Sequence, residues 1–344
     1  MNTAPILSIS PADKARLKIM FLAKHAFSDG ALDDEDGSHA LYHYELRTTL
    51  KQIGMNVTPA NSYAELFEKP DVDFVFTLLN RGGFVNSEMM APLLLRRLGL
   101  PFLGASPILR GLSDDKHLMK TVAARRGVPI TPWIAVRQGQ GGMVDLPEDW
   151  GTIVIKPNAS SASWGVLITE DRAAIRAKGE EILASGHDVI IEPYAPLHDI
   201  AVPVVGGDGE WILPPFGYYP KENIGLARSY EEKRNLVATA VEEDPLETVS
   251  DPDLVNRLIG YTKAMMPELW PFDYGRFEYR YDPETGDIRF MEVNLSCNLW
   301  SKKTISRSAR SIGYSHSELV ENILAHSLER QGLITALRQR SGFA

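Results

Sequence analysis

The sequence predicts an α/β fold made of more than one module, and its alternating elements are the first observation that supports this. In the first hundred residues, apolar runs at residues 17–22 and 72–79 alternate with helical patterns at residues 40–54 and 87–98. Strands and helices in this order predict a parallel sheet with helices on its faces. A Pro-rich stretch at residues 128–134 then marks the entry into a second module.

The second module is predicted from a short series of strands and one helix. An apolar strand at residues 151–157 leads into a loop of small residues at 158–165, and a second strand follows at residues 166–168. A helix at residues 172–185 precedes a strand at residues 188–194, which leads out of the module.

The remainder forms the largest module. It contains a strand at residues 200–205, a polar loop at 218–243 and a helix at 251–267. Two strands within residues 274–294 are joined by a turn, and an amphipathic helix follows at residues 315–330.

Composition and charge exclude several classes of protein. The chain has 344 residues, 44% of them hydrophobic and 24% charged, with a formal net charge of -9. This acidic balance gives no general attraction to nucleic acid or to anionic membranes, so neither is expected as a partner. The single cysteine, Cys297, excludes an intrachain disulfide framework and any multi-cysteine metal site. With no signal-peptide pattern in residues 1–18 and no apolar run of about 20 residues, we expect a soluble cytoplasmic protein.

The predicted hairpin in the last module carries the strongest chemical signal. Side chains two apart on a strand share a face, so Arg276 and Glu278, and likewise Glu292 and Asn294, can point into one cleft. Oxygen ligands of this kind suit Mg²⁺, which usually shares them with substrate phosphates. The alternative is an ordinary amphipathic hairpin with a surface ion pair.

The second signal is Lys156, which ends an apolar strand before the small-residue loop. Small side chains let backbone N–H groups approach phosphate oxygens, and the lysine adds a point charge. Ser161 and Ser163 of this loop are therefore candidate nucleotide contacts. The spacing differs from a Walker A loop. A Ser-rich surface turn is the alternative.

The third signal is the pair of acids Glu192 and Asp199 at the exit from the second module. A carboxylate here is well placed to accept hydrogen bonds from ribose hydroxyls, and the backbone near Glu192 is well placed to meet an adenine edge. Taken singly, each acid is more often a surface residue than a ligand.

The order and spacing of these pieces resemble the ATP-grasp superfamily, and within it the D-alanine:D-alanine ligase branch, over residues 74–328. The motifs that carry the resemblance are Asp115-Lys116, Ile155-Lys-Pro, Ile191-Glu-Pro with Asp199, Tyr230-Glu-Glu-Lys233, Gly275-Arg-Phe-Glu278 and Met291-Glu-Val-Asn294. The segment at residues 98–104 is also similar.

The resemblance implies an ATP-grasp fold of three domains. These are an N-terminal parallel α/β substrate domain at residues 1–107, a small central ATP lid at 108–191 and a C-terminal α+β catalytic domain at 192–344. It also implies that a substrate carboxylate attacks the γ-phosphate of ATP. The resulting acyl-phosphate is intercepted by an amine, and ADP and phosphate are released.

The resemblance also implies a role for each matching residue. Lys116 and Lys156 correspond to lysines that contact ATP phosphates, and Lys233 to one that approaches the γ-phosphate. Glu192 and Asp199 occupy the adenine and ribose positions. Glu278, Glu292 and Asn294 match the ligands of two Mg²⁺ ions, which Mn²⁺ can replace, and Arg276 matches the arginine that steadies the acyl-phosphate and the tetrahedral intermediate.

The chain departs from the branch where the branch binds its amino acids. Ala162 stands in place of a substrate-positioning serine, and Arg234 in place of the tyrosine after the third ATP lysine. Residues 297–300 replace a Pro-Gly-Met stretch, and Lys303 and Thr304 replace the serine and leucine that bind the acceptor carboxylate. The ATP half is retained, whereas the amino-acid half is changed.

Asn298, Lys303, Arg234 and His43 are therefore candidate substrate contacts. Lys302 and Lys303 can hold an anionic group of the acceptor, although solvated lysines flanking a helix are an equal alternative. The segment at residues 39–45 lies where the branch places a donor-binding glutamate, and a purely structural helix is the alternative there.

We therefore expect an ATP- and Mg²⁺-dependent ligase that joins an amino-acid-like carboxylate to an amine. One alternative is a D-alanine:D-alanine ligase with divergent substrate contacts, and another is a nucleotide-binding regulator without turnover. Small amino-acid-like molecules are the expected partners, together with a second copy of the chain, since members of the branch are often dimers.

Overall fold

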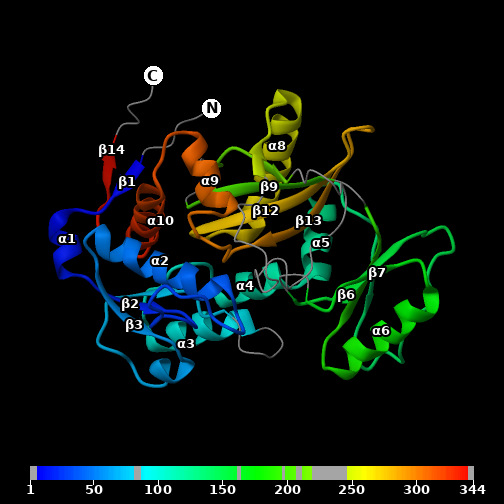
Figure 1. The fold of residues 1–344 in the computed structure, drawn as a ribbon, viewed down its shortest axis with the longest axis horizontal. Coiled ribbons are helices and arrows are strands. Elements are labelled where there is room, and N and C mark those ends of the chain that lie inside the picture. The colour runs from blue at the N-terminus through cyan, green and yellow to red at the C-terminus, as the bar shows by residue number, and fades with distance from the viewer. Residues whose placement is uncertain are drawn as a thin grey trace.

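The computed structural model describes residues 6–80, 87–160, 164–195, 198–206, 211–218 and 246–339. Helices and strands are mixed along the whole chain, and the strands form separate sheets (Figure 1). The α/β class predicted from the sequence is confirmed.

The N-terminal part is a parallel sheet in the order β3-β2-β4. Its strands are β2 (Lys18–Leu22), β3 (Asn56–Ala60) and β4 (Phe74–Thr77), and its helices are α1 (Pro11–Arg16), α2 (Ser38–Gln52), η1 (Tyr63–Leu66), η2 (Ser87–Met89) and α3 (Met90–Leu98). Ile19 and Phe21 of β2 enter one buried cluster, while Met20 and Leu22 enter another. Successive side chains alternate between faces, so this sheet is covered on both sides, as parallel sheets are.

The central part is an antiparallel sheet in the order β5-β8-β6-β7, with α6 against it. Its elements are β5 (Ile134–Val136), β6 (Ile153–Pro157), β7 (Leu167–Thr169), α6 (Arg172–Ala184) and β8 (Val189–Pro193). Figure 1 shows β6, β7 and α6 standing apart from the rest of the ribbon at the right. Two helices connect this part to the N-terminal sheet, α4 (Pro107–Asp114) and α5 (Lys116–Arg125).

The largest sheet has the order β11-β10-β9-β12-β13 and is antiparallel. Its strands are β9 (His198–Val205), β10 (Phe216–Tyr218), β11 (Leu246–Thr248), β12 (Tyr274–Tyr281) and β13 (Ile288–Asn294), and its helices are α8 (Pro252–Leu269), α9 (Thr304–Ser311) and α10 (His316–Arg330). Helices α5 and α8 contribute Met119 and Leu258 to the core beneath this sheet, where Phe277 of β12 is fully buried.

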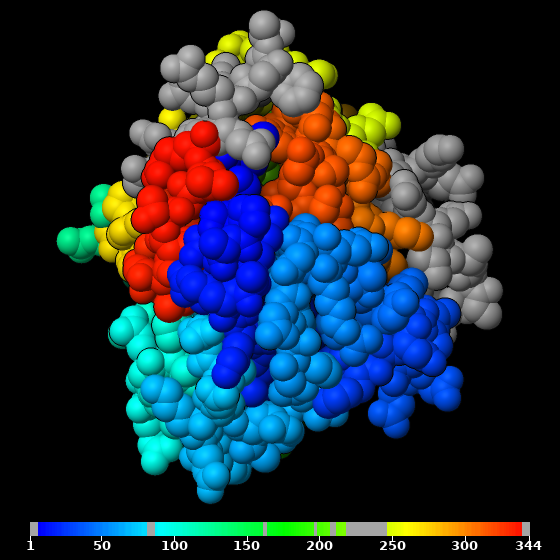
Figure 2. Space-filling view, turned by 90° about the vertical axis from the view of Figure 1, so that its left-hand side faces the viewer, coloured from blue at the N-terminus to red at the C-terminus, as the bar shows by residue number. Residues whose placement is uncertain are grey.

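The two ends of the chain meet on one side of the molecule. β1 (Ile6–Ser8) pairs with β14 (Leu337–Gln339), and α10 packs on α2, so that Leu46 and Leu324 share one core. Figure 2 shows the N-terminal and C-terminal segments, in blue and red, side by side on this face. The N-terminal sheet and the C-terminal helices therefore share one hydrophobic core.

The predicted helices and strands are observed as helices and strands, but some of their end residues differ. Helix α2 covers residues 38–52 where residues 40–54 were predicted, and α8 continues past Pro267 to Leu269. The predicted domain boundary at residues 191 and 192 lies inside β8, a strand between β5 and β6. The boundaries of the three domains stay predictions. The predicted polar loop at residues 218–243 lies outside the described residues, apart from its start in β10.

Candidate functional site

The hairpin of β12 and β13 brings four polar side chains to one face of the large sheet. Arg276 lies opposite Asn294, and Glu278 lies opposite Glu292, in the antiparallel register. The residues between them, Phe277 and Val293, are buried on the other face of the sheet. The predicted grouping of these four side chains on one face is confirmed, because strand alternation and register together fix it.

Within this group, Arg276 and Glu278 form a close ion pair. The Arg276 Nε and Nη2 atoms donate to Oε1 of Glu278 at 2.9 and 2.5 Å. Burial lowers the pKa of Arg276, but Glu278, Cys297 and Glu292 together outweigh burial and raise this pKa further above its usual value. The guanidinium is therefore a permanent cation at the site.

Lys116 connects the hairpin with the small-residue loop. It is the first residue of α5, whose N-cap, Asp115, accepts a hydrogen bond from the backbone N–H of Leu118 at 2.9 Å. The buried Lys116 Nζ donates to the backbone oxygen of Ser160 at 2.5 Å and lies 3.7 Å from Oε2 of Glu292. A cation thus lies between the loop after β6 and the Glu292 carboxylate of β13.

Glu192 is buried between two lysines. Its Oε2 lies 2.7 Å from Nζ of Lys120, and its Oε1 pairs with Nζ of Lys156 on the neighbouring strand β6. Burial raises the pKa of Glu192, but Lys156 and Lys120 outweigh burial and bring it down to about 2. The side chain of Glu192 is therefore a charged partner of both lysines, while its predicted role at the adenine stays a prediction.

Lys120 was not predicted from the sequence as a site residue. Burial lowers its pKa, and the Glu192 carboxylate opposes that effect. A signal for it exists, because Lys116 and Lys120 are four apart on α5 and therefore lie on the same face of that helix. Its Nζ also lies 6.0 Å from the centre of the Trp133 ring.

A second charged cluster that was not predicted lies beside the hairpin, on α4 and η2. Buried Arg110 pairs with Glu88 at 2.9 Å. Burial raises the pKa of Asp114, the last residue of α4, to about 6, with further upward contributions from Glu88 and Glu292 that Lys116 and Arg110 partly oppose. An acidic group close to Glu292 therefore belongs to the electrostatic surroundings of the site.

Asp199 lies near the start of β9, with about half of its side chain exposed. Its Oδ1 is 2.7 Å from Nε of Arg280, the residue opposite it on β12. The exposure suits a residue that meets a ribose, and that role stays a prediction.

The segment after β13 contains the predicted acceptor contacts. Asn298 accepts a hydrogen bond from the backbone N–H of Trp300 at 2.8 Å, and Lys303 is the N-cap of α9. Lys302 Nζ lies 5.6 Å from the centre of the Trp300 ring. Cys297 is buried in the core, and burial raises the pKa of its thiol to about 12. Its burial and raised pKa therefore favour packing in the core over a role as a nucleophile.

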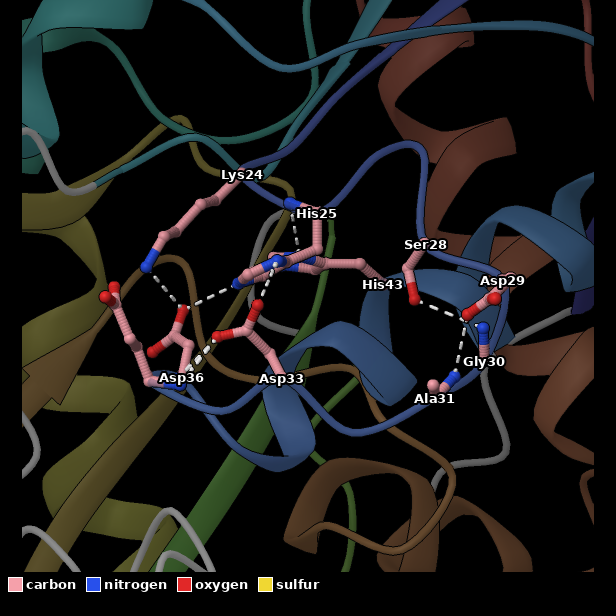
Figure 3. A network of polar contacts seen from close by, with 10 residues as sticks. Lys24, His25, Ser28, Asp29, Gly30, Ala31, Asp33, Asp36 and His43 are labelled. Carbon is pink, nitrogen blue, oxygen red and sulfur yellow. Dashed lines mark hydrogen bonds and ion pairs between the residues drawn. The ribbon is translucent and has the colours of Figure 1, made fainter.

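The loop between β2 and α2 holds a network around His43, another predicted substrate contact (Figure 3). Asp36 accepts hydrogen bonds from Nζ of Lys24 at 3.1 Å and from Nε2 of His25 at 2.9 Å, and Asp33 lies 3.8 Å from Nδ1 of His25. His43 is buried, and its Nδ1 accepts the backbone N–H of His25 at 3.2 Å. The ring centres of His39 and His43, both on α2, are 5.8 Å apart.

Several predicted residues lie outside the described residues. These are the residues Ser161, Ala162, Ser163, Lys233 and Arg234. Trp164 is described, is nearly half exposed and has its ring centre 5.1 Å from that of His187.

The donor set of the hairpin suits a hard cation that shares its ligands with phosphates. Glu278, Glu292 and Asn294 offer only oxygen atoms, and two carboxylates leave coordination positions for phosphate oxygens and water. In the part of the chain that the structure describes, no group of three or more His, Cys, Asp or Glu side chains is arranged to hold a metal ion. No helix in the described ranges combines the length and apolarity needed to cross a membrane.

Comparison of the sequence with curated proteins finds distant relatives along most of the chain. It is 27% identical to the D-alanine–D-alanine ligase of Clostridium perfringens over 272 residues, which are 78% of this chain and 85% of that one. It is 25% identical to the same enzyme of Desulfovibrio desulfuricans, over 72% of this chain and 78% of that one. A match of 26% identity covers 68% of this chain and 68% of the uncharacterized protein y4sG of Sinorhizobium fredii. No protein-family model matches the chain.

Solved structures agree with the sequence matches. The D-alanine–D-alanine ligase of Bacillus anthracis complexed with ATP has a TM-score of 0.69 to this chain at 22% identity, covering 92% of this chain and 98% of that one. A second structure of the same ligase has a TM-score of 0.70. The fold is therefore the three-domain ATP-grasp fold, and along most of its length the chain is similar to D-alanine–D-alanine ligases.

Proposed function

We propose that the chain is an ATP-dependent, ADP-forming ligase that joins an amino-acid-like carboxylate to an amine, the amine of a second amino acid in the first instance. The observation that carries this proposal is the single face of β12 and β13 on which Arg276, Glu278, Glu292 and Asn294 meet, with Lys116 close to Glu292. This combination of cations and oxygen ligands suits a phosphoryl group in transfer.

In the proposed reaction, a carboxylate oxygen of the first substrate attacks the γ-phosphorus of ATP and ADP leaves. The amine of the second substrate then attacks the acyl carbon, and phosphate leaves with the oxygen that had bridged carbon and phosphorus. Mg²⁺ held by Glu278, Glu292 and Asn294, or Mn²⁺ in its place, supplies charge neutralisation to the phosphates.

The lysines and the arginine have different roles in the proposed reaction. Lys116 and Lys156 neutralise the phosphate oxygens. Lys233, which lies outside the residues that the structure describes, has the same role. Arg276, held by Glu278, stabilises the negative charge that develops on the tetrahedral intermediate. Lys120 acts indirectly, because its partner Glu192 also holds Lys156.

Two observations distinguish this proposal from its rivals. The segment with Asn298, Trp300 and Lys303 differs from that of the branch, which favours substrates other than two D-alanines. The complete set of Arg276, Glu278, Glu292 and Asn294 favours turnover over a regulator that only binds nucleotide, since binding alone does not require all of these residues. A homodimer and a cytoplasmic location stay predictions.

The test offers Mg·ATP with a matrix of amino acids in pairs and measures ADP and phosphate release, with mass spectrometry of the products. We expect ADP release that depends on one pair, and a product whose mass equals the pair less one water. A product of two D-alanines alone would favour the D-alanine–D-alanine ligase. Formation of AMP would contradict the proposed mechanism, and nucleotide binding without turnover for every pair would favour the regulator.

A further inference from the structure

Helix α2 of the N-terminal part holds the segment that follows β13. Tyr42 and Glu45 are three residues apart on this helix, so they lie on the same face. The backbone N–H of Leu299 donates to the Tyr42 hydroxyl at 3.2 Å. Residues far apart in the sequence are thus joined directly after β13, the strand that carries Glu292 and Asn294.

Glu45 makes the larger set of contacts with this segment. Its Oε2 accepts the indole N–H of Trp300 at 2.9 Å and the hydroxyl of Ser301 at 3.0 Å, while its Oε1 accepts the backbone N–H of Ser301 at 3.0 Å. Nε2 of His316, the first residue of α10, lies 3.5 Å from Oε1. Both oxygens of the carboxylate are therefore engaged by the protein itself.

Trp300 transmits this anchoring to the neighbouring residues. Its ring is buried in the core, its backbone N–H donates to Oδ1 of Asn298 at 2.8 Å, and its backbone oxygen accepts the N–H of Lys303 at 2.9 Å. The residues on either side of Trp300 are thus fixed by hydrogen bonds to its backbone. Because Glu45 fixes the indole, it also limits where Asn298 and Lys303 can lie.

We infer that Glu45 is a positioning residue for the amine-bearing substrate. It acts through Trp300 and Ser301, by holding residues 298–303 (the acceptor segment) in one conformation, and makes no contact with the substrate itself. This inference rests on the proposed function, in which Asn298 and Lys303 face the acceptor. Pre-organised contacts of this kind act on binding and orientation of one substrate, so the ATP site should be unaffected.

The test compares Glu45→Gln with Glu65→Gln in the full-length protein, using the substrate pair found in the matrix above. The glutamine keeps the size of the side chain but presents an N–H donor where Trp300 and Ser301 donate. Glu65 is the control because it is an exposed carboxylate on η1, also in the N-terminal part. We expect the KM for the amine substrate to rise about tenfold in Glu45→Gln with the KM for ATP unchanged, because hydrogen bonds to a charged group are lost. Glu65→Gln should match the wild type.

Hydrogen exchange supplies a readout that does not depend on turnover. We expect faster exchange in residues 298–303 of Glu45→Gln and unchanged exchange in β6 and β8. Ser301→Ala, which removes only the hydroxyl contact, should raise the amine KM less, and the double variant should show less than the sum of the two effects. This milder variant also decides the matter if Glu45→Gln fails to fold.

The outcomes separate the inference from the proposed function. An active wild type with an unchanged amine KM in Glu45→Gln and Ser301→Ala would overturn the inference alone. Equal rises in the KM for ATP and for the amine would also overturn it, because they would show a general structural role. A wild type inactive with every pair would overturn the proposed function, and the inference with it.

Discussion

Substitution of Glu292 is the most direct test of the predicted metal site. It lies opposite Glu278 on the hairpin and 3.7 Å from Lys116, with about a third of its side chain exposed. We expect Glu292→Gln to abolish ATP turnover, since an amide lacks the charge that a phosphate-bound Mg²⁺ requires. ADP release measures the effect and circular dichroism verifies the fold.

The matched control is Glu284→Gln, which changes an exposed carboxylate in the turn of the same hairpin. It should turn over ATP at the wild-type rate. Wild-type turnover by Glu292→Gln would show that the metal-site assignment is wrong.

Glu192 is the residue whose charge matters most to stability. Removing the carboxylate leaves Lys120 and Lys156 without their shared partner, so Glu192→Gln should lower the free energy of unfolding by about 3–5 kcal/mol. Asp199→Asn, at a half-exposed ion pair with Arg280, should lower it by less than about 1 kcal/mol. Urea denaturation compares the two, and equal losses would contradict the account.

The same group predicts a pH dependence. The pKa of Glu192 is about 2 in the folded chain, below the ordinary value of 4.5. Its contribution to stability is therefore fully present above pH 4.5 and is lost as the pH falls from there toward 2. Urea denaturation between pH 7 and pH 3 should show a smaller loss of stability in Glu192→Gln than in the wild type. An equal loss in both proteins would show that Glu192 does not titrate in this way.

At the scale of elements, the turn from β6 toward β7 ends at Gly165. This glycine has φ +71°, and a Cβ there would lie 2.8 Å from Cγ of Pro157. Gly165→Ala should therefore strain the end of the loop, lower stability by about 1–2 kcal/mol and weaken ATP binding. Gly151→Ala, before the same strand and with open space around it, is the control and should bind ATP as the wild type does. Nucleotide titration measures both variants, and equal affinities would contradict a role for this turn in ATP binding.

The elements themselves were largely predictable from the sequence. Period-two and helical patterns predicted β2, β6, β12, β13 and the main helices, because each buries an apolar face. The ends were less predictable. For example, α2 begins at Ser38, and its N-cap residue Gly37 has no side chain that could mark the start of the helix with a capping hydrogen bond.

Long-range partners were the part of the site that the sequence did not predict. Lys120 and Glu45 are polar residues on ordinary helices, and only the ion pair of Lys120 with Glu192 of β8 and the hydrogen bonds of Glu45 to the acceptor segment give them their roles. By contrast, the grouping of Arg276 with Glu278, Glu292 and Asn294 follows from strand alternation, so it was predictable.

For the whole molecule, we expect that the residues of the ATP site are retained from the branch, whereas the residues of the amino-acid site are changed. Lys303 tests this division, since it precedes α9 where the branch has a serine. Lys303→Ser should raise the KM of the amine substrate several-fold and leave the KM of ATP unchanged, because an ammonium contact with an anionic acceptor is lost. Steady-state kinetics with each substrate varied in turn makes the comparison. Equal changes in both constants would remove Lys303 from the acceptor site.

Transfer of the γ-phosphoryl group of ATP to the substrate carboxylate can be followed with an oxygen isotope. The carboxylate substrate is labelled with ¹⁸O and incubated with Mg·ATP and the amine, and the released phosphate is examined by mass spectrometry. We expect one ¹⁸O atom in each released phosphate and none in ADP, because the oxygen that bridged carbon and phosphorus in the acyl-phosphate leaves with phosphorus. Unlabelled phosphate, or label found in AMP, would contradict the acyl-phosphate route.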